Sequence, residues 1–167
     1  MKLAVDVHYG RIIAATGGIA FSDWSDNQET AVYRSLCREP AAYVSGQFFR
    51  REMPCILHLL DEHAITPDTI VIDGFVYLDG ERVPGLGKHL FDALGQRIPV
   101  VGVAKGRYVK APDSLRVYRG KSHRPLYVTS VGMPVSTARH CIQVMHGAFR
   151  IPTLLKRADQ VSRGTFS

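Results

Sequence analysis

The chain has 167 residues, of which 46% are hydrophobic and 22% are charged. This composition is typical of a globular protein and excludes disordered and fibrous chains, and the length predicts a single domain over residues 1–167. No apolar run is long enough to cross a bilayer, and the N-terminal residues lack a signal-peptide pattern, so we expect a cytoplasmic protein with no membrane partner. The three cysteines lack metal-type spacing and are expected to be reduced thiols.

Charge is unevenly distributed along the sequence. Residues 1–104 contain 9 Lys and Arg against 13 Asp and Glu, whereas residues 105–167 contain 12 against 2. An acidic part joined to a strongly basic part indicates a polyanionic partner beside a carboxylate-lined site. A solvated basic surface without such a partner would explain the same numbers.

The first third of the chain is predicted to form antiparallel strands. Lys2–Tyr9 and Arg11–Thr16 have the pattern of two strands joined by a tight turn, and Gly17-Gly18 is expected to bulge or end the second one. Residues 21–28 are rich in Ser, Asp and Asn and predict a loop, after which Thr30–Cys37 predicts a third strand.

Two helices are predicted on either side of a short buried strand. Apolar residues recur at helical spacing over Phe49–Ala64, and Pro54 is tolerated only in a first turn, so this helix is expected to begin near Glu52 or Met53. The second helix covers Leu86–Leu94.

The buried strand is Thr69–Gly74, in which four of six residues are β-branched. It ends in Asp73, at the strand end where α/β sheets usually bind ligands, although Asp-Gly is also a common turn dipeptide. With the helix that follows and a strand at Ile98–Val103, it predicts a parallel pair joined by a right-handed crossover. The remaining elements are expected to be a strand pair and two helices, at Leu115–Tyr118, Leu126–Ser130, Ser136–Gly147 (with Ser136 as its cap) and Ile151–Val161.

The predicted fold class is therefore α/β with a mixed sheet, in which three antiparallel strands precede alternating helices and strands. This order can bring Asp6, Glu52 and Asp73 to one edge of the sheet. Carboxylates grouped in this way are the ligands of Mg²⁺, which supplies an activated water and charge compensation for hydrolysis of a phosphodiester. Taken singly, Glu52 has a simpler explanation, because an acidic side chain at the start of a helix interacts favourably with the helix dipole.

Several segments together resemble the endonuclease V family. They occur in the family's order and at similar spacing over nearly the whole chain, and they are Val5–Tyr9, Tyr43–Gly46, Phe49–Glu52, Ile72–Gly74, Gly85–Leu90, Gly102–Lys105, Pro125–Gly132, Arg150–Pro152 and Arg157–Asp159. The resemblance implies a ribonuclease H-like fold and a hydrolase, a Mg²⁺-dependent endonuclease that accepts Mn²⁺ as a substitute. Members cut DNA or RNA near deoxyinosine or inosine, usually one phosphodiester beyond the lesion on its 3′ side, in DNA repair.

The resemblance also implies roles for particular residues. Asp6, Glu52 and Asp73 are expected to be catalytic and to bind the metal, with Asp159 as a further metal ligand, although alone it would be an ordinary helix-surface acid. Lys105 is expected to be catalytic, by neutralising a phosphate or orienting the attacking water.

Four further residues are expected to bind nucleic acid. Tyr43 corresponds to the family's wedge, an aromatic that fills the gap left by an unstacked base, and Gly46 lets that loop approach the bases. Arg51 and His89 are expected to contact the nucleic-acid strand, although a histidine on a helix is almost as often packed against neighbours. The expected partner is DNA or RNA that is single-stranded or contains a lesion.

The sequence departs from the family after Asp73. The family usually continues with histidines, whereas this chain has Phe75–Gly80, and Ser45 and Met133 replace a common proline and histidine. Two alternatives therefore stand beside the inosine-directed nuclease: a nuclease of the same fold with another substrate, and a non-catalytic nucleic-acid-binding relative.

Overall fold

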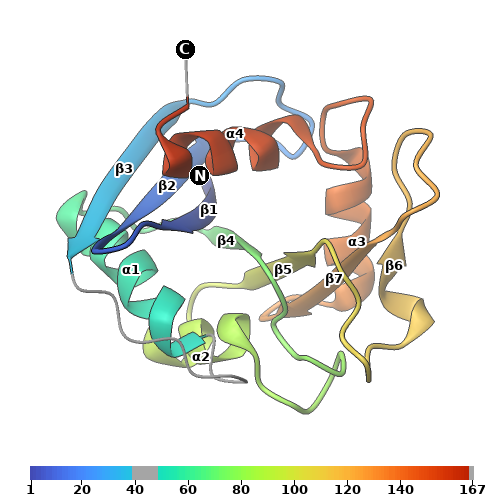
Figure 1. The fold of residues 1–167 in the computed structure, drawn as a ribbon. Coiled ribbons are helices and arrows are strands. Elements are labelled where there is room, and N and C mark those ends of the chain that lie inside the picture. Colours follow the sequence, from blue (N-terminus) through green and yellow to red (C-terminus); the bar gives the residue numbers. More distant parts are fainter. Residues whose placement is uncertain (39–48, 166–167) are drawn as a thin grey trace.

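One seven-stranded mixed sheet organises the chain (Figure 1). The computed structural model describes residues 1–38 and 49–165. The strands are β1 (Lys2–Tyr9), β2 (Ile13–Phe21), β3 (Ala31–Arg38), β4 (Thr69–Asp73), β5 (Val100–Ala104), β6 (Arg116–Val117) and β7 (Leu126–Val131). The helices are α1 (Phe49–Glu62), α2 (Leu86–Ala93), α3 (Val135–Val144) and α4 (Thr153–Arg163), with a 3-10 turn, η1, at Asp113–Leu115.

The strand order is β3-β2-β1-β4-β5-β7-β6. The first three strands are antiparallel, β1 pairs with β4 and β4 with β5 in parallel, and β7 is antiparallel to both β5 and β6. The mixed sheet, its antiparallel beginning and the parallel β4–β5 pair confirm the predicted fold class.

Helices cover both faces of the sheet and bury a large hydrophobic cluster on each face. Because successive strand residues point to opposite faces, Leu3 and Val5 of β1 pack with α1 and α2, whereas Ala4 packs with α3 and α4. On β4, Ile70 and Ile72 pack on the α1 side and Val71 on the α4 side. No helix in residues 1–38 and 49–165 is long and apolar enough to cross a membrane.

Several predicted boundaries were wrong. The second strand continues through Gly17-Gly18 to Phe21. The described part of α1 begins at Phe49, so Pro54 lies inside the helix at the expense of one main-chain hydrogen bond. Ser136 is not a cap, because α3 is preceded by Pro134, and α4, which follows Pro152 as expected, continues past Val161 to Arg163. At Gly17-Gly18, packing against α4 and α1 outweighed the local signal.

Candidate active site

Two of the predicted carboxylates lie on neighbouring parallel strands, Asp73 as the last residue of β4 and Asp6 within β1, one residue beyond the Val5–Ile72 pair. Asp6 is two residues beyond Ala4 on β1, and Asp73 is two residues beyond Val71 on β4. Since Ala4 and Val71 belong to the core under α3 and α4, strand alternation places both carboxylates on that same face of the sheet. The sheet edge and the face are thus both fixed by the strand pattern.

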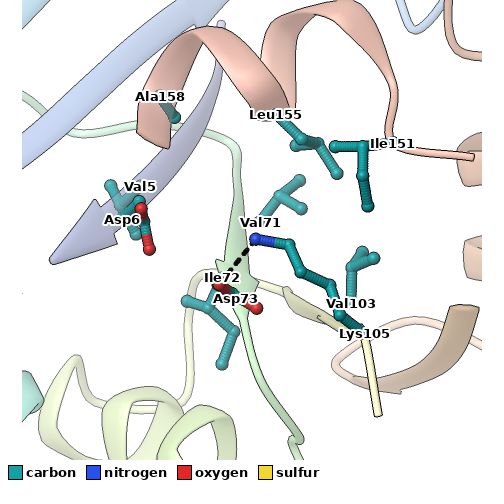
Figure 2. A pocket seen from close by; sticks show the side chains of 10 residues that line it. All are labelled: Val5, Asp6, Val71, Ile72, Asp73, Val103, Lys105, Ile151, Leu155 and Ala158. Atoms are coloured by element: carbon teal, nitrogen blue, oxygen red, sulfur yellow. Dashed lines mark hydrogen bonds and ion pairs between the residues drawn. The ribbon is translucent and has the colours of Figure 1, made fainter. Parts of the chain in front are cut away.

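A small cavity lies between these side chains (Figure 2). Its volume is about 20 Å³, enough for one water-sized occupant. Its polar lining is Asp6, Asp73 and Lys105, and its apolar lining is Val5, Val71, Ile72, Val103, Ile151, Leu155 and Ala158. Lys105 follows β5 directly, and its Nζ lies 3.1 Å from Asp73 Oδ2.

Helix α4 reaches the site because β2 has no side chain at Gly17, the residue paired with Asp6. A Cβ there would lie 2.6 Å from both the Ala158 carbonyl oxygen and the Ser162 amide nitrogen. The close approach brings Ser162 Oγ within 3.3 Å of Asp6 Oδ2. The unbroken strand through Gly17-Gly18 therefore allows α4 to pack beside Asp6 of β1.

Burial and mutual repulsion shift the acidities of the site. Glu52 is only 8% exposed, and burial together with the charges of Asp73 and Asp6 raises its pKa to about 9. Burial and the charge of Asp73 raise the pKa of Asp6 to about 7. Asp6, Glu52 and Asp73 thus influence one another electrostatically, and Asp159 also acts on Asp6.

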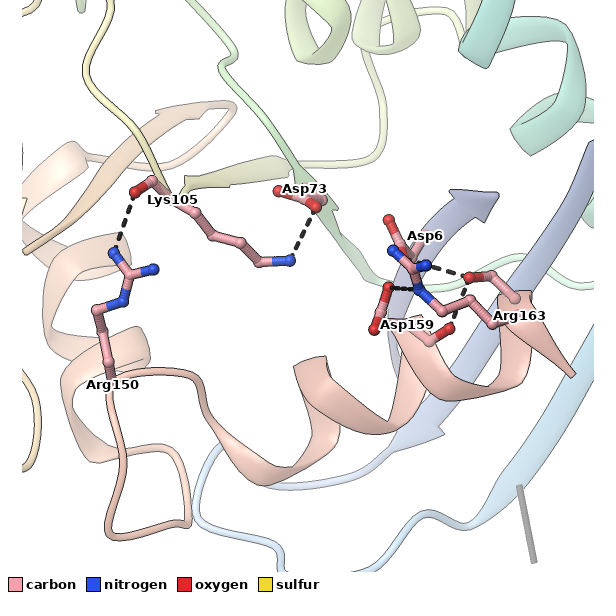
Figure 3. A network of polar contacts seen from close by, with 7 residues as sticks. Asp6, Asp73, Lys105, Arg150, Asp159 and Arg163 are labelled. Atoms are coloured by element: carbon pink, nitrogen blue, oxygen red, sulfur yellow. Dashed lines mark hydrogen bonds and ion pairs between the residues drawn. The ribbon is translucent and has the colours of Figure 1, made fainter. Parts of the chain in front are cut away.

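The pKa of Asp159 is shifted in the opposite direction. Burial acts to raise its pKa, but the hydrogen bond from Arg163 and its contact with Asp6 bring the pKa below the ordinary value. Arg163 Nε donates to Asp159 Oδ1 over 2.8 Å (Figure 3). This carboxylate is therefore already neutralised by a neighbour on its own helix.

The donor set suits Mg²⁺ chemically, although the side chains are not gathered into a closed cage. In residues 1–38 and 49–165, no three His, Cys, Asp or Glu side chains are close enough together to hold one ion. Mg²⁺ usually takes one or two carboxylates and completes its octahedron with water and substrate phosphate. Asp6 and Asp73 beside the cavity match that requirement, and a cation between them would relieve the repulsion that contributes to the raised pKa of Asp6.

A second network extends from the site into the basic part of the chain. Arg150 Nη1 donates to the carbonyl oxygen of Lys105 over 3.0 Å, so the end of β5 is tied to the segment between α3 and α4 (Figure 3). Lys105 then links this segment to Asp73 through its ammonium group. Arg150, Ser162 and Arg163 were not predicted, because their roles depend on contacts between elements far apart in sequence.

Two of the four predicted nucleic-acid-binding residues, His89 and Arg51, lie in the part of the chain that the structure describes. His89 stacks on Phe49, with ring centroids 3.7 Å apart, and Arg51 lies 3.8 Å over the ring of Tyr9. Both side chains are thus packed against aromatic rings, and their contact with nucleic acid stays a prediction. Tyr43 and Gly46 lie outside the described residues.

The segment after Asp73 that differs from the family, Phe75–Gly80, borders a second hollow, of about 140 Å³. Its lining is Phe49, Asp73, Gly74, Phe75, Leu78, Pro84, Gly85 and Leu86. The segment is fixed at both ends: Thr129 Oγ1 accepts the Val76 amide at 2.8 Å, and Asp79 Oδ1 accepts three backbone amides of residues 81–83. The hollow is therefore a formed feature next to the carboxylates.

Comparison with known proteins shows which sequences this chain is similar to. The sequence model of the endonuclease V family matches residues 3–145. Endonuclease V of Nostoc punctiforme is 31% identical over 89% of this chain and 74% of that protein. Endonuclease V of Alkalilimnicola ehrlichii is 29% identical over 78% of this chain, which spans just under two thirds (66%) of that protein's length.

Solved structures agree on the fold. Endonuclease V of Streptomyces avermitilis superposes with a TM-score of 0.77 at 24% identity, over 97% of this chain and 79% of that one. Endonuclease V of Ciona intestinalis, solved with a 24-mer DNA containing an inosine followed by a ribo-adenosine, superposes with a TM-score of 0.80 at 17% identity, over 98% and 84%. The ribonuclease H-like fold is thereby confirmed.

Proposed function

The chain belongs to the endonuclease V family, whose members are hydrolases of nucleic-acid ester bonds, and we propose that it is a Mg²⁺-dependent endonuclease. The proposed reaction is hydrolysis of a phosphodiester near deoxyinosine or inosine, in DNA repair in the cytoplasm. The observation that carries this proposal is the arrangement of Asp6, Asp73 and Lys105 around one cavity, with the buried Glu52 coupled to the two aspartates.

The residues divide the work between metal binding, charge compensation and proton transfer. Asp6 and Asp73 would hold the metal, with Glu52 and Asp159 as further carboxylates at its side. Bound Mg²⁺ supplies charge compensation for the phosphoryl oxygens and a more acidic water. Lys105 Nζ, at 3.1 Å from Asp73 Oδ2, provides a positive charge that can turn to a phosphate oxygen.

Proton transfer is the role that suits Glu52. Burial raises its pKa to about 9 in the metal-free site, so at neutral pH the carboxyl is protonated there, and a cation bound beside it would favour its ionised form. Once ionised, Glu52 could accept a proton from an attacking water. The same burial excludes bulk water from that side of the site.

The hollow beside Asp73 supports recognition of an unstacked base. It is lined by Phe49, Phe75 and other apolar residues and lies against a proposed metal ligand. Unstacked bases are held by stacking and by contacts to their edges, and the Ciona relative was solved with inosine-containing DNA. Because the family's histidines are replaced here by Phe75–Gly80, the base that this hollow accepts is the part of the proposal most open to change.

Cleavage of end-labelled single-stranded oligonucleotides tests the proposal. Substrates carry one deoxyinosine, one inosine or only ordinary bases, and each is incubated with Mg²⁺ or with chelator. We expect a Mg²⁺-dependent cut near the inosine, and loss of more than 100-fold of the rate in Asp73→Asn with binding retained. Asp113→Asn, which changes an exposed aspartate on η1, is the matched control.

Other outcomes separate the alternatives. Cutting that needs Mg²⁺ but ignores inosine would identify a nuclease with another substrate. Binding without cutting under all these conditions would contradict the catalytic proposal and leave a nucleic-acid-binding relative.

A further inference from the structure

Phe149 is an exposed aromatic side chain on a segment that is otherwise tightly held. Its side chain is 78% exposed, in the connection between α3 and α4 (Figure 1). Arg119 is only 4% exposed, and its guanidinium donates to the carbonyl oxygens of Met145, Gly147, Phe149 and Arg150. One buried arginine thus fixes the whole backbone of this connection.

Two glycines tighten the same segment. A Cβ on Gly120 would lie 2.3 Å from the carbonyl oxygen of Ala148, so the chain around Arg119 touches the connection directly. Gly147 has a φ of 125°, which side chains other than glycine rarely adopt. Holding an apolar ring in water on a rigid backbone does not help the fold, because the ring buries little surface there.

The ring stands between two hollows. The first, of about 340 Å³, is lined by Lys105, Phe149, Arg150, Ile151, Lys156 and Asp159. The second, of about 330 Å³, is lined by Glu29, Phe149, Ile151, Thr153, Leu154, Lys156, Arg157 and Gln160. Phe149 and Lys156 border both hollows, and the first hollow also reaches two residues of the proposed active site.

Backbone contacts fix the position of Phe149 relative to the catalytic residues. The next residue, Arg150, donates from Nη1 to the carbonyl oxygen of Lys105 at 3.0 Å, and Lys105 Nζ contacts Asp73. The ring is therefore carried by the same network that holds the lysine of the site. Of the 63 residues from 105 onward, 12 are Lys or Arg and 2 are Asp or Glu, so a polyanion is favoured over an apolar protein surface here.

From this geometry we propose that Phe149 is a stacking platform for a base of the substrate strand next to the bond that is cut. The phosphates on either side of that base lie toward Lys156 and toward Lys105 with Arg150. The ligand class is single-stranded nucleic acid, whose bases have exposed faces and whose phosphates need cations. Because the backbone is already fixed by Arg119, stacking costs little ordering of the protein. This inference rests on the proposed function and adds a nucleotide-binding position to it.

Binding without catalysis is the first test. A fluorescently labelled single-stranded 12-mer of thymidine is titrated with the full chain in chelator, so that no cleavage occurs. We expect Phe149→Ala to weaken binding by roughly 5- to 150-fold and Phe149→Leu to weaken it nearly as much, because leucine keeps apolar area but has no ring face. Ile12→Ala, which removes another exposed apolar side chain (70% exposed) at the far β1–β2 turn, should leave binding unchanged.

Salt dependence distinguishes the ring from the cations around it. Phe149→Ala should keep the wild-type slope of log affinity against log salt, since it releases no counterion. Lys156→Ala should make that slope shallower by about 0.7. A purely structural role for Phe149 would instead alter the slope, or leave both affinity and slope unchanged.

Direct contact is tested with Phe149→Trp. Stacking of bases should quench its added fluorescence, relative to the wild-type chain with Trp24 alone, when the thymidine 12-mer is added. An abasic 12-mer, which keeps the phosphates but has no bases, should bind without that quenching. Equal quenching by both oligomers would overturn the stacking proposal.

These measurements can refute the stacking proposal without refuting the proposed function, and the reverse. If wild-type protein cuts nucleic acid with Mg²⁺ but Phe149→Ala binds as tightly as wild type, the platform is wrong and the nuclease stands. If the ring-dependent binding is found in a protein that never cuts, the nuclease is wrong and the platform stands. If Phe149→Ala separates a dimer while leaving oligonucleotide binding intact, the ring belongs to a protein interface and the proposal falls.

Discussion

At the scale of single residues, Glu52 is a buried carboxyl that destabilises the fold when it is ionised. It is 8% exposed, and its pKa is raised first by burial and then by the charges of Asp73 and Asp6. Arg51, whose guanidinium lies over the ring of Tyr9, acts in the opposite direction and lowers this pKa. A buried carboxyl beside two others is unfavourable for the fold, and the chemistry that we propose for the site would account for its presence.

Replacing Glu52 by glutamine should therefore stabilise the metal-free protein. The amide keeps the shape but cannot ionise, so at pH 8 in chelator we expect Glu52→Gln to raise Tm by roughly 2–4 °C, equivalent to about 1 kcal/mol. The same variant should lose Mg²⁺-dependent cleavage. Glu81→Gln, on the exposed part of residues 75–84, should change neither property. A lower Tm for Glu52→Gln in thermal unfolding would show that its carboxylate stabilises the fold.

At the scale of elements, α4 and β2 form the contact that completes the site. Gly17 lies in the middle of β2 opposite Asp6, and its missing side chain makes room for the backbone of α4. The helix then presents Ser162 and Asp159 to Asp6, and Leu155 and Ala158 to the cavity. A change at this glycine should be felt in both stability and catalysis.

Gly17→Ala tests that contact with a single methyl group. The new Cβ would lie 2.6 Å from two backbone atoms of α4, which cannot move without shifting the helix. We expect a loss of about 1–3 kcal/mol in the free energy of unfolding, measured by urea denaturation. The cleavage rate should fall as well, since Asp6 loses its neighbours. Gly106→Ala is the matched control, because a Cβ there meets nothing within 4 Å.

Some elements could be predicted from the sequence, whereas contacts between distant elements could not. α2 was predicted from the helical spacing of its apolar residues, and β4 from its run of β-branched residues. Gly17-Gly18 was misjudged because glycine is usually a strand breaker, and the helix that packs on Gly17 is distant in sequence, with its contacts at Ala158 and Ser162. The face on which Asp6 and Asp73 lie follows from strand alternation, whereas Ser162, Arg119 and Phe149 depend on contacts that no local pattern encodes.

At the scale of the whole molecule, the sheet joins an acidic site to a basic part of the chain. The carboxylates come from β1, α1 and β4, in the part with an excess of acidic residues, and Lys105, Arg150 and Lys156 come from the part with an excess of basic ones. Parallel pairing of β4 with β5 brings the two parts together, with Asp73 opposite Val103 in the register. In the proposed function, a polyanionic strand would be held by cations on one side of its phosphates, with the proposed metal site on the other.

This division predicts that Mg²⁺ stabilises the entire fold without any substrate. In chelator, Asp6 and Asp73 repel each other, and Lys105 is the neighbouring cation that Asp73 contacts. An ion that binds only the folded state at ten times its dissociation constant adds about 1.4 kcal/mol, so Tm should rise by roughly 3–6 °C. Asp73→Asn should lose most of this rise, and Asp113→Asn, whose carboxylate pairs with Arg116 on the far strand of the sheet, should keep it. The measurement is a thermal melt with MgCl₂ against NaCl of equal ionic strength, since screening alone would act on both variants alike. An equal rise in Asp73→Asn would place the bound ion elsewhere and remove Asp73 from the metal site.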